Sequence, residues 1–121
     1  MLCARGVDSA EAVAAELREG GADAWAVGCD VRDAEAVAAL REAAEDHLGV
    51  VDILINNAGI APSAPITSLE LDDWQRVFDV NVTGVYLCTR AFLPGMRAAG
   101  WGRVVTIASI AAKVGHPYIS A

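Results

Sequence analysis

Basic residues are scarce in this sequence of 121 residues. Lysine and arginine together number 9, against 16 aspartates and glutamates, so the formal net charge is −7 at pH 7. Because binding to a phosphate backbone needs a basic face, this composition argues against a nucleic-acid partner. It does not argue against a small anionic ligand, which a few local donors can hold.

Cysteine is also rare, and its spacing excludes two kinds of site. Cys3, Cys29 and Cys88 are far apart, and no CxxC pair or Cys/His spacing typical of a metal site accompanies them. We therefore expect no metal and no disulfide. The pattern indicates reduced thiols in a cytoplasmic protein, packed as small buried hydrophobic side chains.

Long apolar runs are absent as well. No uninterrupted run approaches the about 18 residues that a membrane span needs, and Met1–Arg5 lacks the charged and apolar regions of a signal peptide. We therefore expect no membrane partner. With 55% hydrophobic residues, only four prolines and no low-complexity tract, the sequence is typical of one small globular domain.

What the sequence does contain is a strict alternation of two periodicities. Helical spacing of apolar residues covers 10–17, 37–48 and 70–99, whereas short apolar runs typical of strands cover 2–4, 25–31, 50–55 and 104–108. The first helix is expected to be capped by Asp8 or Ser9, and the second by Asp33. The third is expected to bend near Asn81 and Gly84.

This alternation predicts βαβ units, and hence an α/β fold with a doubly wound parallel sheet and helices on both faces. Ligands in such sheets bind beyond the carboxyl ends of the strands. Asp30, Asn57 and Ser109 all follow predicted strands. We therefore expect these polar residues to lie along one edge of the sheet.

Four motifs carry a more specific signal. In chain order they are Asp30-Val31, the segment Asp52–Gly59 with its NNAG end, Asn81–Gly84, and the strand Arg103–Ser109. Together they resemble the short-chain dehydrogenase/reductase family, in particular its NADP-dependent 3-oxoacyl and polyketide ketoreductases. The resemblance covers nearly the whole chain.

The resemblance implies a Rossmann-type fold in which residues 1–121 form part of an NAD(P)-binding domain. The family's first strand and glycine-rich turn are expected before Met1, and its catalytic tyrosine and lysine after Ala121. The sheet should then be incomplete, with a gap between its first and second strand pairs, and the fragment should be inactive alone. The implied activity is hydride transfer between a nicotinamide cofactor and a small ketone or secondary alcohol, possibly a 3-oxoacyl thioester.

Two of the motifs are implied to bind the cofactor. Asp30 would accept a hydrogen bond from the adenine amino group, and Val31 would pack against the ring. Asn57, Ala58 and Gly59 would let the backbone pass close to the flat cofactor, because small side chains leave room. On the residues alone, Asp30 could equally be a helix cap, and Asn57–Gly59 an ordinary tight turn.

Arg5 bears on the choice between NADP and NAD. Relatives that prefer NAD usually end the second strand with an acidic residue, which binds the ribose hydroxyls. Here that place is Ala4, and the guanidinium that follows suits a 2′-phosphate. We therefore expect NADP rather than NAD, a solvent-exposed arginine being the other interpretation.

The catalytic residues implied within this chain are Ser109 and Asn81. Ser109 would hydrogen-bond the substrate oxygen, and Asn81, at a local break in its helix, would support a proton relay through water. A loop serine and a kink residue satisfied by backbone are the alternatives. Tyr118 and His116 are expected to be loop residues near the substrate mouth, because the family's tyrosine falls just beyond Ala121.

Two other classes of protein share this alternation of strands and helices. A receiver-type signalling domain could use Asp30, but the strand end Ile107–Ser109 lacks the lysine that such a domain needs. A non-catalytic nucleotide-binding regulator would need neither Asn81 nor Ser109. The full-length protein is also expected to be a homo-oligomer, because the helix over 82–93 is apolar on most sides.

Overall fold

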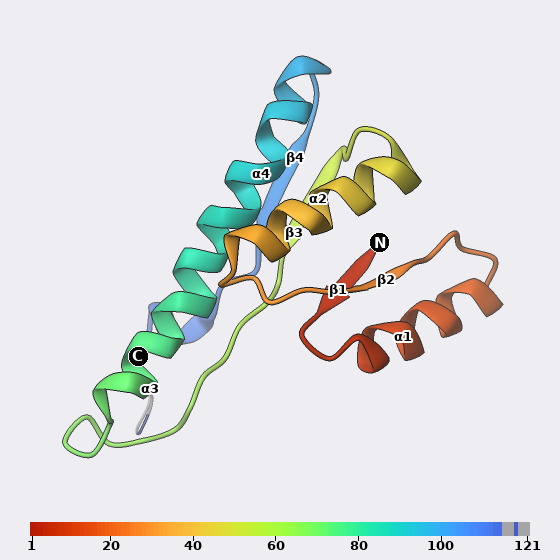
Figure 1. Cartoon of the computed structure of the whole chain (residues 1–121). Helices are drawn as coiled ribbons and strands as arrows, with labels where there is room; N and C mark the ends of the chain where they lie inside the picture. Colours follow the sequence, from red (N-terminus) through yellow and green to blue (C-terminus); the bar gives the residue numbers. More distant parts are fainter. Residues whose placement is uncertain (115–117, 119–121) are drawn as a thin grey trace.

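A computed structural model describes residues 1–114 and Tyr118 (Figure 1). In chain order the elements are β1 (Leu2–Ala4), α1 (Val7–Glu19), β2 (Ala26–Gly28), α2 (Ala34–Leu48), β3 (Ile53–Asn56), α3 (Leu71–Phe78), the π-helix η1 (Asp79–Thr83), α4 (Gly84–Ala98), β4 (Arg103–Thr106) and the 3₁₀-helix η2 (Ile110–Ala112). Each expected helix and strand is present. Apart from β1, the strands are shorter than the apolar runs that predicted them.

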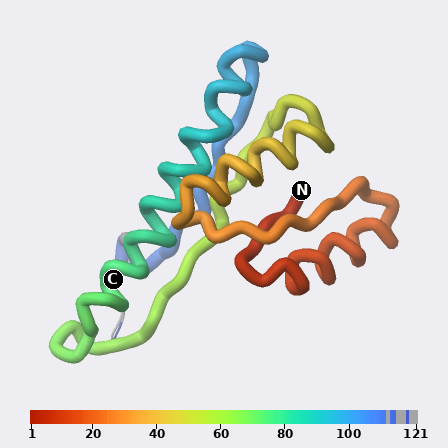
Figure 2. Tube along the Cα trace, viewed as in Figure 1, coloured from red at the N-terminus to blue at the C-terminus, as the bar shows by residue number. Residues whose placement is uncertain are grey.

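Both strand pairs in the described part of the chain are parallel. β1 pairs with β2, with Leu2 opposite Ala26, and β3 pairs with β4, with Ile53 opposite Arg103. The pairs form two separate two-stranded sheets. Figure 1 and Figure 2 show β1 and β2 (red and orange) standing apart from β3 and β4. The incomplete Rossmann-type α/β fold is therefore confirmed, with the expected gap between the two strand pairs.

Helices lie on opposite sides of the incomplete sheet, as a doubly wound fold requires, although they do not cover every face. α1 packs against β1 and β2, where Gly28 lies beside Val7. Successive strand residues face opposite ways, so Val27 and Cys29 turn toward the core formed with α2 and α4. The buried members of that core are Cys29, Val31, Val37, Leu40, Ala44, Val80, Cys88, Phe92 and Met96.

The predicted cap of α2 is confirmed. The Oδ1 atom of Asp33 accepts hydrogen bonds from the backbone N–H groups of Glu35 at 2.8 Å and Ala36 at 3.3 Å. These bonds satisfy two of the free donors at a helix start. The helix is followed by Gly49 at φ 70°, a conformation that favours glycine.

The predicted cap of α1 is wrong. The helix already begins at Val7, and Gly6 occupies the cap position without a side-chain hydrogen bond. The Ser9 hydroxyl instead donates to the carbonyl oxygen of Gly6 at 2.8 Å. Asp8 lies in the first turn, where its negative charge suits the helix dipole.

The predicted bend in the long helix is a change of helix type. Asp79–Thr83 form the π-helix η1, which joins α3 to α4. Asn81 lies in the middle of this segment, and Gly84 begins α4. Short π-helical segments leave hydrogen-bonding positions in the ladder open and are frequent at functional sites.

One face of the second sheet is uncovered in the described part of the chain. Leu54 and Asn56 face α4, whereas Ile53 and Ile55 are 55% and 59% exposed. Apolar exposure of this size is typical of surfaces that pack against another segment or a partner. No described helix combines the length and hydropathy needed to cross a bilayer.

Candidate cofactor and active site

A groove of about 700 Å³ runs between the two sheets. Its walls come from β1 and β3, which face each other, and from α2 and α4. The expected cofactor-binding residues all line it: Arg5, Asp30, Val31, Asn57, Ala58 and Gly59. The fold therefore gathers residues that follow three different strands, at the edge where ligands bind in α/β sheets.

The carboxylate of Asp30 is held by Arg32. Nε of Arg32 donates to Oδ1 at 3.0 Å and Nη2 donates to Oδ2 at 2.6 Å, while the backbone N–H of Arg32 donates to Oδ1 at 3.1 Å. These bonds lower the pKa of Asp30 from 3.8 to about 2, with a smaller contribution from the charge of Arg5. Asp30 is therefore ionised and acts as an acceptor. The helix-cap interpretation is wrong, because Asp33 caps α2.

Arg5 is exposed at the mouth of the groove. Among the described residues its guanidinium has no hydrogen-bond or ion-pair partner, although its charge reaches Asp30. The carboxylate of Asp30, on which the charge of Arg5 acts, is already hydrogen-bonded to Arg32. Arg5 is thus left available for an anion from outside the described chain.

Val31 is positioned by the start of α4. A Cβ atom added to Gly84 would lie 2.7 Å from Cγ2 and 3.2 Å from Cβ of Val31. Only glycine permits this approach, so Gly84 sets how deeply Val31 sits. Val31 is largely buried in the core while it also lines the groove.

The segment Asn57–Gly59 contains no turn, so the tight-turn interpretation is wrong. Gly59 does not have a positive φ. A Cβ atom there would lie 3.5 Å from Oδ1 of Asn81, which is an ordinary van der Waals distance. Neither backbone strain nor internal crowding in the described chain therefore accounts for glycine at this position.

Asn81 ties the π-helix to the segment that follows Gly59. Its Nδ2 donates to the carbonyl oxygen of Ile60 at 2.9 Å, and its Oδ1 accepts from the N–H of Ile60 at 2.9 Å. Both ends of the amide are thus engaged by backbone. The side chain therefore fixes one wall of the groove. This agrees with the alternative interpretation, in which Asn81 is a kink residue whose amide is satisfied by backbone.

Ser109 lies three residues after β4 and is exposed, outside the residues that line the groove. Its hydroxyl oxygen accepts from the N–H of Ala111 at 3.1 Å and caps η2. Tyr118 is exposed, and its carbonyl oxygen accepts from the N–H of Ala64 at 2.8 Å. His116 lies outside the described residues.

Three residues near the groove have structural roles that sequence reasoning missed. Asn56 is buried, and its Nδ2 donates to Oγ1 of Thr89 at 3.2 Å, which joins β3 to α4. Gly84 was expected only as a bend, and Arg32 was not singled out at all. The Asp-x-Arg spacing after a strand is the one signal that could have indicated the Arg32 ion pair.

Burial decides the state of the cysteines. Removal from water raises the pKa of Cys29 and of Cys88 to about 11, so both thiols stay protonated and unreactive at neutral pH. Cys3 departs from the expectation of burial: it is exposed, and it lines the groove between the two sheets. Within residues 1–114 and Tyr118, no group of three or more His, Cys, Asp or Glu side chains could hold a metal ion.

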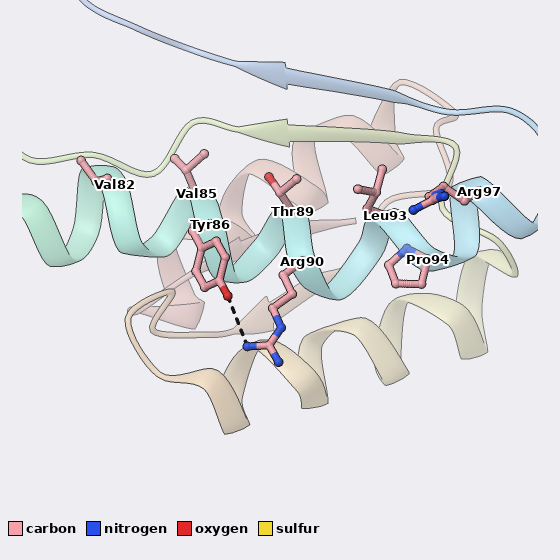
Figure 3. A pocket seen from close by; sticks show the side chains of 8 residues that line it. All are labelled: Val82, Val85, Tyr86, Thr89, Arg90, Leu93, Pro94 and Arg97. Carbon is pink, nitrogen blue, oxygen red and sulfur yellow. Dashed lines mark hydrogen bonds between the residues drawn. The ribbon is translucent and has the colours of Figure 1, made fainter.

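A second groove, of about 790 Å³, follows the exposed side of α4 (Figure 3). It is lined by Val82, Val85, Tyr86, Thr89, Arg90, Leu93, Pro94 and Arg97. Nη1 of Arg90 lies 3.4 Å from the Tyr86 hydroxyl, and its guanidinium lies over the Tyr86 ring. Cys88 and Phe92, on the other side of the helix, are buried. The helix thus has two apolar sides, of which the core covers one.

Comparison with known proteins agrees with this geometry. The sequence model of the family described as short chain dehydrogenase matches residues 1–121. The 3-oxoacyl-[acyl-carrier-protein] reductase of Synechocystis sp. is 39% identical over 109 residues, which make up 90% of this chain and 44% of that protein. The chain thus spans less than half the length of this relative.

Solved structures give the same result. Actinorhodin polyketide ketoreductase with NADPH superposes with a TM-score of 0.92 at 37% identity, covering 97% of this chain and 46% of that one. NAD+-bound xylitol dehydrogenase gives a TM-score of 0.92 at 34% identity, with 98% and 46% covered. The receiver-type alternative finds no support. The chain belongs to the short-chain dehydrogenase family of NAD(P)-dependent oxidoreductases.

Proposed function

We propose that this chain is part of the NADP-binding domain of an oxidoreductase that transfers a hydride between the cofactor and a ketone or secondary alcohol. The observation that carries the proposal is the groove between the two sheets. An unpartnered arginine, an ionised aspartate and an uncrowded glycine segment meet there. Each of these features suits one part of the cofactor.

Arg5 would bind the 2′-phosphate of NADP. Its guanidinium lacks a partner among the described residues, and a phosphate matches the planar fork of donors that arginine presents. The similar structures named above contain NADPH in one case and NAD+ in the other. The preference for NADP therefore rests on Arg5 and on the absence of an acidic residue at Ala4.

Asp30 and Val31 would hold the adenine. The carboxylate of Asp30 is an acceptor suited to the adenine amino group, and Val31 gives the groove an apolar wall at the same strand end. The segment Asn57–Gly59 would pass close to the cofactor. No contact within the described chain requires glycine at position 59, so the absence of a side chain there would leave space for the cofactor to approach the backbone.

Ser109 and Asn81 would act in catalysis. The bound cofactor would supply or accept the hydride. The Ser109 hydroxyl, which uses its oxygen to accept from Ala111, still has its hydrogen to donate to the substrate oxygen. Because the Asn81 side chain is engaged by Ile60, its part in a proton relay would fall to a carbonyl oxygen freed by the π-helix.

For the substrate we propose a small carbonyl compound, such as a 3-oxoacyl thioester or a polyketide-like ketone. The similarity to a 3-oxoacyl reductase and to a polyketide ketoreductase supports this class. A cytoplasmic location fits the buried thiols, whose chemistry needs no oxidising compartment.

The test needs a protein of the relatives' length that contains these 121 residues, which we call the full-length enzyme. Ser109→Ala should lower turnover of a 3-oxoacyl thioester by about 100- to 1000-fold while NADPH affinity stays unchanged. Ser68→Ala is the control, because the Ser68 hydroxyl makes only a local bond to Pro65. Retention of more than about a third of turnover would remove Ser109 from the catalytic set, since one such donor is worth far more than that. A non-catalytic regulator would bind NADPH without any turnover.

We further propose that the groove along α4 is covered by a second copy of the chain. Val82, Tyr86 and Leu93 are 56%, 57% and 39% exposed on this side, and a helix with two apolar sides is buried on both. The full-length enzyme should therefore sediment as a dimer or larger species at micromolar concentration. Tyr86→Asp should shift it toward the monomer, and a wild-type enzyme that sediments as a clean monomer would contradict this proposal.

A further inference from the structure

We infer that Arg32 is a positioning residue for cofactor recognition, which orients the carboxylate of Asp30 toward the adenine amino group and keeps it away from Arg5. This inference rests on the proposed function and adds a residue to it. Arg32 does not line the groove itself. It acts only through the aspartate that does.

The contacts between the two side chains fix both carboxylate oxygens. Nε of Arg32 lies 3.0 Å from Oδ1 and 3.1 Å from Oδ2 of Asp30, and Nη2 lies 2.6 Å from Oδ2. The backbone N–H of Arg32 adds a bond to Oδ1 at 3.1 Å. A planar fork held in this way allows the carboxylate one orientation, which a single bond would not.

The carboxylate keeps room for a ligand. A carboxylate has about four lone-pair positions, and Arg32 supplies three hydrogens, from its backbone nitrogen, Nε and Nη2. About one position therefore stays open for an N–H donor such as the adenine amino group. Recognition and positioning are thus compatible on the same side chain.

Arg5 is what makes the clamp necessary. Asp30 and Arg5 line the same groove, and the charge of Arg5 already acts on Asp30. Arg5 is exposed and Asp30 is partly exposed. Without Arg32, an Asp30–Arg5 ion pair would remove the acceptor for adenine and the cation for a 2′-phosphate at once. Arg32 disfavours this pairing because it already occupies about three of the four acceptor positions of Asp30.

The experiment compares two cofactors on the full-length enzyme: NADPH, and deamino-NADPH, in which hypoxanthine replaces adenine and the amino group is lost. Arg32→Ala and Arg32→Lys are the test variants, since lysine keeps the charge but not the fork. Arg41→Ala is the matched control. Arg41 is 36% exposed against 37% for Arg32, and it also bonds a carboxylate, at 2.9 Å in Glu45.

Wild type and Arg41→Ala should bind NADPH at least about tenfold more tightly than deamino-NADPH, which is the lower end of the range for one hydrogen bond to a charged acceptor. In Arg32→Ala and Arg32→Lys this ratio should fall below about threefold, and the preference for NADPH over NADH should shrink with it. If Arg32 were merely structural, its replacement would weaken the binding of NADPH, deamino-NADPH and NADH equally.

That result would overturn the inference. Tighter NADPH binding by Arg32→Ala would also overturn it, because Arg32 would then be a competitor of the cofactor for Asp30. If the wild-type enzyme binds no NADPH, that result would contradict the proposed function, and the inference that rests on it would be overturned as well.

Discussion

The side-chain amide of Asn81 makes two hydrogen bonds with the backbone of Ile60, donating to the carbonyl oxygen and accepting from the N–H, each at 2.9 Å. This pair of bonds connects the π-helix η1 with the segment that follows Gly59. The residue that the family resemblance assigns to proton transfer therefore also fixes one wall of the groove. Loss of Asn81 should thus affect stability as well as turnover.

Asn81→Ala should lower the free energy of unfolding of the full-length enzyme by about 1–3 kcal/mol, because Ile60 loses the partners of both its N–H and its carbonyl oxygen. Asn81→Asp should also destabilise the enzyme, because the carboxylate still accepts from the N–H but its second oxygen would face the carbonyl oxygen of Ile60 with no hydrogen to donate. Urea unfolding followed by circular dichroism measures both variants. An Asn81→Ala enzyme as stable as wild type would show that the two bonds do not hold this wall.

Gly84→Ala should destabilise the full-length enzyme by about 1–3 kcal/mol through overpacking, because the added Cβ would lie 2.7 Å from Cγ2 of Val31. NADPH binding should weaken with it, since Val31 lines the groove. Gly95→Ala is the control within the same helix. Its Cβ would meet only Glu45 at 3.9 Å, so alanine should stabilise α4 by about 0.5–1 kcal/mol. Equal effects of the two changes on unfolding would contradict the close packing of Gly84 on Val31.

The Asp30–Arg32 pair should persist in acid. The bonds from Arg32 lower the pKa of Asp30 from 3.8 to about 2. Since the folded value is the lower one, the stabilisation is fully present above about pH 4 and is lost as the pH falls toward 2. An NMR titration of the Asp30 carboxyl carbon should show this low midpoint in wild type and a midpoint between that value and 3.8 in Arg32→Ala, where the side-chain bonds are lost but the backbone N–H bond and the charge of Arg5 remain. Identical midpoints in the two proteins would mean that the ion pair does not form in solution.

The 121-residue chain expressed alone should be insoluble or molten and without dehydrogenase activity. The edges of β1 and β3 that face the groove have no partner strand among the described residues, and unpaired apolar edges promote aggregation. Ile53 and Ile55 add exposed apolar surface. Calorimetry should show no sharp transition. A soluble chain with a cooperative transition that NADPH shifts to higher temperature would disprove this expectation.

The fold class was predictable because helical and strand periodicities alternate without exception. The parallel pairing, the Asp33 cap and the break at Asn81 follow from local patterns that tertiary contacts do not override. The start of α1 was not predictable, because Ser9 donates to Gly6 where the pattern expects an acceptor. A serine hydroxyl can either donate or accept a hydrogen bond, so the sequence alone does not say which of the two Ser9 does at the helix start.

The sequence predicted the residues that line the groove as cofactor-site candidates, but it predicted neither their connections nor the position of Ser109 outside the groove. Strand ends and motif spacing place Arg5, Asp30 and Gly59 on one edge, and the groove contains all three. The clamp of Arg32 on Asp30 and the contact of Gly84 with Val31 depend on side-chain orientation and on the approach of elements distant in sequence. Composition and periodicity carry no information about either.

The most direct test of the proposed site is the binding of NADPH and NADH to the full-length enzyme and its Arg5→Ala variant, measured by calorimetric titration. We expect wild type to prefer NADPH, and Arg5→Ala to lose about 1.5–3 kcal/mol of NADPH binding, the usual value of a hydrogen bond to a charged group. NADH binding should hardly change, because NADH has no 2′-phosphate for Arg5 to contact. Equal losses for both cofactors, or no loss for either, would contradict the assignment of the groove beside Arg5 as the NADP site.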